Sequence, residues 1–288
     1  RPNVNPMDWT SGAAKASDAI IVVMGLTGEL EGEEGESILS ATSGDRLNYN
    51  LPANQIAFLR ELRKGNKKPI IAVITGGSPI NLAPVDSLAD AVLLAWYPGE
   101  EGGAAVGDIL FGKTSPSGKL PVTFPESLSQ LPPFRDYSME GRTYRYMKAT
   151  PLYPFGYGLS YAHFVFSNIK APATTLNKDQ SFEVTATITN NGKYAGEEVA
   201  QLYISDLTGQ KDAPLFALKG FQRTMLSPGE SKQVSFTVTP KMMAIINEKG
   251  ERMVNAGKHE IYIGGAVPIP RSEVLGISKP VSVSFTVK

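Results

Sequence analysis

Three short apolar runs in the first part of the chain constrain its fold more than any other feature. They cover Ala19–Met24, Pro69–Thr75 and Asp90–Trp96, and each is continuous and rich in branched or apolar side chains. Such runs are typical of strands buried on both faces. Segments with helical character separate them, and strands that alternate with helices predict a parallel sheet covered by helices on both sides.

The segments between the runs carry the signals of helices. Leu51-Pro52 opens one helix, which has apolar residues at helical spacing and Gly65 at its expected C-cap. Three further helical segments are predicted at 9–16, 81–88 and 100–111. The first part of the chain is therefore predicted to be an α/β domain with a mainly parallel sheet flanked by helices.

From Phe164 onward the apolar residues alternate with polar ones at period two, which is the pattern of half-buried strands. Turn signals separate the runs, the clearest being Asn190–Gly192 and Ser227–Glu230. The alternating runs cover 182–189, 198–204, 233–238, 257–264 and 281–287. About seven short strands at this spacing predict an all-β, immunoglobulin-like sandwich.

The stretch between these patterns, Lys113–Tyr161, is rich in proline, glycine and tyrosine. Proline excludes a long helix or a central strand, and the many aromatic rings argue against a disordered linker. The predicted organisation is an α/β domain at 1–122, a packed Pro/Tyr-rich linker at 123–162 and the β-sandwich at 163–288, with the linker lying over the first domain.

An acidic, glycine-rich stretch follows the first apolar run and is the main candidate for chemistry. It carries five glutamates within twelve residues, namely Glu29, Glu31, Glu33, Glu34 and Glu36. Its glycines disfavour a helix, and it leaves the carboxyl end of a core strand, where open α/β sheets bind ligands. It is a candidate source of a general acid/base carboxylate. A solvated surface loop is the alternative interpretation.

The composition excludes several classes of function. Lys plus Arg equals Asp plus Glu at 28 each, so we expect neither nucleic acid nor membrane as a partner. The chain has no cysteine and only two histidines, His163 and His259, which argues against a metal site. No phosphate-binding glycine motif follows the first run, and its acidic loop would repel phosphate, which disfavours nucleotide binding.

Several motifs occur in order along the chain, namely Gly44–Arg46 with Leu51-Pro52 and Gln55, Ala95–Ala104, Leu110–Gly112 with Ser117–Pro125, Gly141–Tyr146 with Leu152–Tyr161, and Leu218–Gln222 with Leu226–Glu230. Together these motifs resemble the C-terminal portion of glycoside hydrolase family 3. The resemblance implies an α/β sandwich domain followed by a fibronectin type III-like domain. In the family these domains come after an N-terminal barrel.

The resemblance also implies an activity. Family members hydrolyse terminal β-linked sugars with retention, using an aspartate nucleophile on the barrel and often a glutamate acid/base on a loop of the second domain. Met7–Trp9 resembles the nucleophile motif, but no apolar strand precedes it. The nucleophile is therefore expected on a barrel outside this chain, and Arg1 is expected to mark a cleavage point.

Within the acidic stretch, Glu31-Gly32-Glu33 resembles a pair of glutamates in the xylosidase-like branch of the family. By that match Glu33 is the first acid/base candidate, followed by Glu31 and Glu34. Eleven residues between Glu33 and Asp45 depart from the family pattern and leave the register open. The implied function is that of a β-glucosidase. A β-xylosidase and a non-catalytic module that binds glycan or protein are the alternatives.

The remaining expectations concern partners and single residues. The resemblance implies a β-linked glycoside substrate, a barrel fragment or subunit as partner, no cofactor, and a periplasmic or secreted location, while a homodimer stays open. Trp96 and Tyr97 are expected to stack on a sugar or pack in the core. Arg142 and Arg145 are expected to stack on tyrosines.

Overall fold

The computed structural model describes residues 6–32, 45–172, 174–211, 213–247 and 249–288. It divides into two compact units. The first unit comprises the chain up to Leu110 together with Phe124–Leu128, and the second comprises Phe111–Thr123 and Ser129–Lys288. No helix in the described ranges is both long enough and apolar enough to cross a bilayer.

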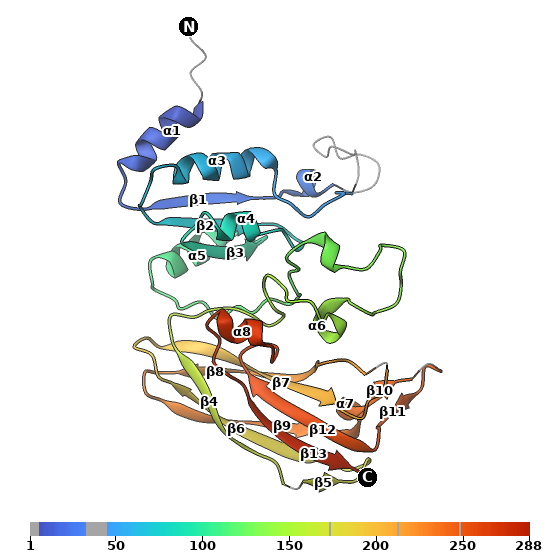
Figure 1. Cartoon of the computed structure of the whole chain (residues 1–288). Coiled ribbons are helices and arrows are strands. Elements are labelled where there is room, and N and C mark those ends of the chain that lie inside the picture. Colours follow the sequence, from blue (N-terminus) through green and yellow to red (C-terminus); the bar gives the residue numbers. More distant parts are fainter. Residues whose placement is uncertain (1–5, 33–44, 173, 212, 248) are drawn as a thin grey trace. The chain divides into compact units, whose positions relative to one another are not determined.

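The first unit has the predicted parallel sheet, with strand order β1-β2-β3 (Figure 1). The strands are β1 (Ile20–Gly25), β2 (Ile70–Thr75) and β3 (Ala91–Trp96). The helices are α1 (Pro6–Lys15), α2 (Gly28–Glu31), α3 (Ala53–Arg63), α4 (Ala83–Asp86) and α5 (Gly102–Leu110). The central strand β2 is the most buried because it has a neighbour on each side, which agrees with its unbroken apolar sequence.

One element differs from the sequence-based expectation. The start of the acidic stretch was expected to stay non-helical because of its glycines, but Gly28–Glu31 forms the single-turn helix α2. The Thr27 side chain caps this turn by accepting a hydrogen bond from the Leu30 amide at 3.4 Å. Residues 33–44, which include most of the acidic stretch, lie outside the described residues.

The second unit contains the predicted β-sandwich. One sheet has the order β5-β13-β12-β7-β8 and the other β4-β6-β9. The strands are β4 (Phe164–Lys170), β5 (Thr175–Leu176), β6 (Phe182–Asn190), β7 (Gly196–Asp206), β8 (Ala217–Leu226), β9 (Ser231–Val238), β12 (Gly257–Gly264) and β13 (Val281–Val287). Alternate residues of these strands, such as Val184, Ile188, Val234 and Ile261, fill the core between the sheets.

Strand β8 is not among the strands predicted from the alternation of apolar and polar residues. Its burial does not alternate, since residues in its middle are half-buried or exposed in succession. The register between β7 and β8 also shifts between Leu202 and Tyr203. A local irregularity of this kind breaks the period on which the sequence-based strand prediction depends.

Smaller elements complete the second unit. They are the short helices α6 (Thr143–Tyr146), α7 (Pro240–Met243) and α8 (Pro270–Val274), and the two-stranded ribbon of β10 (Ile245–Ile246) and β11 (Arg252–Met253). A 3₁₀ turn at Leu128–Gln130 lies where the chain passes from the first unit into the second. By packing, segments 111–123 and 129–162 belong with the sandwich, so most of the predicted linker is part of this unit.

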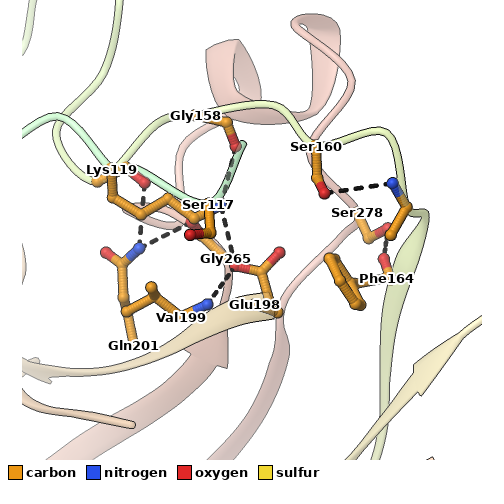
Figure 2. A network of polar contacts seen from close by, with 12 residues as sticks. Ser117, Lys119, Gly158, Ser160, Phe164, Glu198, Val199, Gln201, Gly265 and Ser278 are labelled. Atoms are coloured by element: carbon orange, nitrogen blue, oxygen red, sulfur yellow. Dashed lines mark hydrogen bonds and ion pairs between the residues drawn. The ribbon is translucent and has the colours of Figure 1, made fainter. Parts of the chain in front are cut away.

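A buried polar network attaches the proline-rich segments to strand β7 (Figure 2). Lys119 Nζ lies 2.9 Å from Glu198 Oε1 and donates to the Gly158 carbonyl, also at 2.9 Å. Gln201 Nε2 donates to the carbonyl oxygens of Gly156 and Gly265. These bonds satisfy carbonyl groups of irregular backbone that would otherwise be buried without donors.

Candidate functional site

The carboxyl ends of β1, β2 and β3 meet at one edge of the sheet, because the three strands are parallel. The chain leaves β1 into α2, leaves β2 through Gly76–Ser78, and leaves β3 at Tyr97. This is the edge at which open α/β sheets bind ligands. The described part of the acidic stretch therefore lies where the sequence placed it, after the first strand.

The carboxylate of Glu31 is the centre of this edge. Its Oε1 accepts a hydrogen bond from Ser78 Oγ at 2.7 Å and a longer one from the Gly77 amide at 3.3 Å. Its Oε2 accepts from the Tyr97 hydroxyl at 2.9 Å. Arg46 Nη2 lies 3.8 Å from Oε1 and also donates to Ser78 Oγ at 2.9 Å. Glu31 thus joins the segments that follow all three strands.

The backbone at this edge has features that go with the close contact among Glu31, Gly77 and Tyr97. A Cβ atom at Gly77 would stand 2.7 Å from the Tyr97 ring and 3.2 Å from Glu31 Oε2, so a side chain at this position would push the two partners apart. Trp96 has a φ of 53°, which is unusual for a residue other than glycine and marks backbone strain at the same edge.

Hydrogen bonds also hold the backbone at the point where the chain leaves β1. Gln55 of α3 accepts a hydrogen bond from the Gly25 amide at 3.0 Å and donates one to the Gly25 carbonyl at 2.8 Å. Both backbone groups at the end of β1 are therefore held by one amide side chain. These two hydrogen bonds set the direction in which the chain leaves the sheet.

The surroundings of Glu31 favour its charged form. Burial by itself would raise the pKa of this carboxyl, but the hydrogen bonds from Ser78, Tyr97 and Gly77, with the charge of Arg46, together lower the pKa below its usual value. The pKa of Tyr97 is raised, first by burial and then by its bond to the Glu31 carboxylate. Tyr97 therefore remains a hydrogen-bond donor at neutral pH.

The Tyr97→Phe substitution should raise the pKa of Glu31, because it removes one of the donors that favour the carboxylate. Ionised Glu31 contributes stability above its unfolded-state pKa, and this contribution is lost as the pH falls through its lower folded-state pKa. A carboxyl NMR titration of wild type and variant measures the shift. An unchanged Glu31 pKa would contradict the importance of this bond. The exposed Tyr137, changed to Phe, is the control.

Of the glutamates that the sequence suggests as acid/base candidates, some lie within the described residues and others lie outside them. Glu31 is described, while Glu33, Glu34 and Glu36 lie outside the described residues. Glu29 accepts a hydrogen bond from Thr27 Oγ1 at 3.2 Å. Gly77 and Ser78 were not among the residues predicted from the sequence to lie in a site. The available signal was their position, directly after the second apolar run.

Asp45 and Arg46 precede helix α3, a position from which an aspartate could cap the helix and an arginine could pair with that aspartate. Helix α3 has Pro52 at its N-cap and no side-chain cap bond, so Asp45 does not cap it. The Arg46 guanidinium instead faces Glu31 and donates to the Asn50 carbonyl at 3.4 Å. Arg46 is therefore part of the polar cluster at the carboxyl edge.

The two aromatic residues and the two arginines singled out from the sequence have different surroundings in the structure. Trp96 packs edge-on against Phe124, with ring centroids 6.2 Å apart, whereas Tyr97 is 49% exposed. The Arg145 guanidinium lies over the Tyr146 ring at 5.6 Å, which confirms the expected stacking for this arginine. Arg142 donates to the carbonyl oxygens of Pro133 and Asp136. Within the described ranges, no group of three or more acidic, histidine or cysteine residues could hold a metal ion.

Comparisons with known proteins identify both parts of the chain. Residues 6–161 match the glycosyl hydrolase family 3 C-terminal domain. Residues 198–267 match the fibronectin type III-like domain. The two matches follow the order of the α/β unit and the sandwich along the chain.

Relatives and solved structures agree with these matches. The chain is 36% identical to a periplasmic beta-glucosidase of Salmonella typhimurium over 90% of this chain and 34% of the relative. It is 40% identical to a xylan 1,4-beta-xylosidase of Xylanibacter ruminicola over 88% and 29%, respectively. The structure of a Listeria innocua beta-glucosidase bound to isofagomine aligns with a TM-score of 0.81 and 27% identity, covering 99% of this chain and 39% of that one.

The chain therefore spans about a third of the length of these curated relatives. The family match covers more than half of the chain, and both of its predicted domain types are present in the expected order. The chain belongs to glycosyl hydrolase family 3, of which it carries the C-terminal domain and a fibronectin type III-like domain.

Proposed function

We propose that this chain is the C-terminal part of a retaining, exo-acting β-glucosidase and supplies its general acid/base glutamate from the acidic loop. The observation that carries the proposal is the anchoring of Glu31 at the carboxyl edge of the parallel sheet. It fixes the start of a loop with several further carboxylates at the edge where ligands bind in such sheets. The names of the relatives support the reaction class.

The contacts of Glu31 favour a different role for it within that loop. A general acid must hold a proton near neutral pH, so its pKa has to be raised. The pKa of Glu31 is lowered, and both of its carboxylate oxygens accept hydrogen bonds. We therefore assign Glu31 to positioning the loop. Glu33 is the proposed acid/base residue, and Glu34 is the next candidate.

The other half of the reaction has to come from a second carboxyl group. Retaining hydrolysis uses an acid/base and a nucleophile about 5–5.5 Å apart. The family resemblance assigns the nucleophile to an aspartate on an N-terminal barrel. The proposed partner of this chain is therefore that barrel, as a separate polypeptide or as part of the same protein. Neither carboxylate requires a metal or an organic cofactor.

An exposed apolar surface in the first unit supports such a partner. Val22 and Met24 of β1 are buried, whereas Ile21 is 47% and Val23 is 68% exposed on the opposite face of the strand. These two side chains share their face with Leu93 of β3 through the pairing with β2. Apolar faces of parallel sheets are normally covered, so this face is a candidate for contact with the remainder of the protein.

A β-xylosidase is the second candidate. Two of the relatives, one from Formosa agariphila and one from Xylanibacter ruminicola, carry xylosidase names and are 38% and 40% identical. Each value exceeds the 36% of the Salmonella beta-glucosidase. The proposal also includes a periplasmic or secreted location for this protein. The name of the Salmonella typhimurium relative, a periplasmic beta-glucosidase, supports this location.

Native mass spectrometry of the purified protein, combined with nitrophenyl β-glucoside and β-xyloside assays, tests the proposal. We expect activity only in a species that contains a barrel-sized partner in addition to the 30.9 kDa chain. The ratio of kcat/KM for the two sugars separates glucosidase from xylosidase. Activity of the chain by itself would contradict the need for a nucleophile from a barrel. A barrel-containing species inactive on both sugars would contradict the proposal and favour a non-catalytic binding module.

A further inference from the structure

A cavity of about 300 Å³ in the second unit has a strongly basic lining. Four cationic side chains line it: Arg145, Lys219, Lys241 and Arg252. They come from α6, β8, α7 and β11, and α7 lies with the β10-β11 ribbon at one end of the sandwich (Figure 1). No carboxylate occurs among the described residues that line this basic cavity.

Acidic side chains of the described residues do not neutralise these four cations. None of them takes part in an ion pair with another described residue. The Nε atom of Arg145 is inaccessible to solvent and has no hydrogen-bond partner in the described structure. A buried donor without an acceptor costs free energy, so its retention calls for an explanation.

The cations also act on one another. The pKa of Lys219 is lowered, first by burial and then by the charges of Arg145 and Arg252. Like charges held together in a partly enclosed space destabilise the fold. An anion in the cavity would reduce this repulsion and supply an acceptor to Arg145 Nε.

We propose that the basic cavity binds the oxyanion group of a small ligand of about monosaccharide size, namely a carboxylate, a sulfate ester or a phosphate ester. Guanidinium groups present a planar fork of donors that matches such oxygens, and lysine adds a mobile positive charge. The volume is at the lower end of the range for small-molecule pockets. This site does not depend on the catalytic role of the acidic loop.

Isothermal titration calorimetry on the 288-residue chain at low ionic strength tests the proposal. The probes are sodium sulfate, sodium phosphate and sodium glucuronate, with sodium chloride at matched ionic strength and glucose as the uncharged counterpart of glucuronate. We expect saturable binding at one site for at least one of the three oxyanions and none for glucose. Binding of glucuronate identifies a carboxylated sugar as the ligand class, whereas binding of sulfate or phosphate alone identifies an ester anion.

Two variants connect the binding to the cavity. Lys219→Gln removes a half-buried cation, and Arg252→Ser removes an exposed one from a surface ribbon, where loss of folding is not expected. Each should raise the Kd about tenfold or more, as expected for the loss of one charge-assisted hydrogen bond. Lys178→Gln, an exposed lysine outside the cavity, is the matched control and should leave the Kd unchanged.

Two results would overturn the proposal. One is the absence of saturable binding by all three oxyanions. The other is equal weakening by Lys178→Gln and by the cavity variants, which would indicate binding to the general positive charge of the surface. Circular dichroism of each variant shows that it is folded, and Arg252→Ser keeps the test decisive if Lys219→Gln does not fold.

Discussion

Glu33→Gln should reduce glucoside hydrolysis by the barrel-containing enzyme by about 10²–10⁴-fold, the usual contribution of a general acid/base. The amide can neither protonate the leaving oxygen nor activate water in the second step. For substrates with dinitrophenyl leaving groups, the rate of the first step should fall less, because these groups depart without a proton. Azide should restore turnover, since it attacks the glycosyl-enzyme without needing a base.

Matched substitutions in the same loop separate chemistry from loop positioning. Glu31→Gln should weaken activity through its lost contacts with Ser78, Tyr97 and Arg46, and azide should not restore it. Glu29→Gln is the control for loss of a loop charge. Rescue by azide of Glu31→Gln or Glu34→Gln, in place of Glu33→Gln, would overturn the assignment of Glu33 and identify the other residue as the acid/base.

Lys119→Met should lower the free energy of unfolding of the second unit by about 3–5 kcal/mol, the cost of breaking a buried ion pair by removing one partner. The side chains of Lys119 and Glu198 are only 11% and 7% exposed. The substitution leaves the Glu198 carboxylate buried without its counter-charge and the Gly158 carbonyl without its donor (Figure 2). Urea denaturation of wild type and variant measures the difference.

The same variant should show a defined pH dependence. Burial raises the pKa of Glu198, while the charge and hydrogen bond of Lys119 oppose that rise. Without Lys119 the pKa should rise further. A raised folded-state pKa means that stability falls as the pH increases through the titration of the group. The deficit of Lys119→Met should therefore be smaller at acidic pH than at neutral pH.

Lys232→Met is a close control for this prediction. Lys232 also pairs with a glutamate, Glu230, at 3.0 Å and also donates to a backbone carbonyl, that of Met225, at 2.7 Å. This pair is exposed and screened by solvent, so its loss should cost much less stability than the loss of the buried pair. A Lys119→Met cost no larger than that of Lys232→Met would contradict the role of burial. Adding Glu198→Gln to Lys119→Met should recover part of the lost stability.

The sequence predicted the elements whose side-chain pattern is local. The runs at 19–24, 69–75 and 90–96 correspond to β1, β2 and β3 within about one residue, because continuous runs of apolar and branched residues are typical of parallel strands. The alternating runs of the second unit likewise correspond to β6, β7, β9, β12 and β13. Strand β8 was not recognised from alternation, since a register shift breaks its period.

The sequence predicts a cluster of carboxylates after the first strand of a parallel sheet, and its motifs resemble those of the family to which the chain belongs. The groups that meet Glu31 depend on how the chain folds. Arg46, Ser78 and Tyr97 come from separate segments and converge because parallel strands end at one edge. The pKa of Glu31 depends on those non-local contacts, so no local pattern could distinguish a glutamate that holds the loop from one that carries the proton.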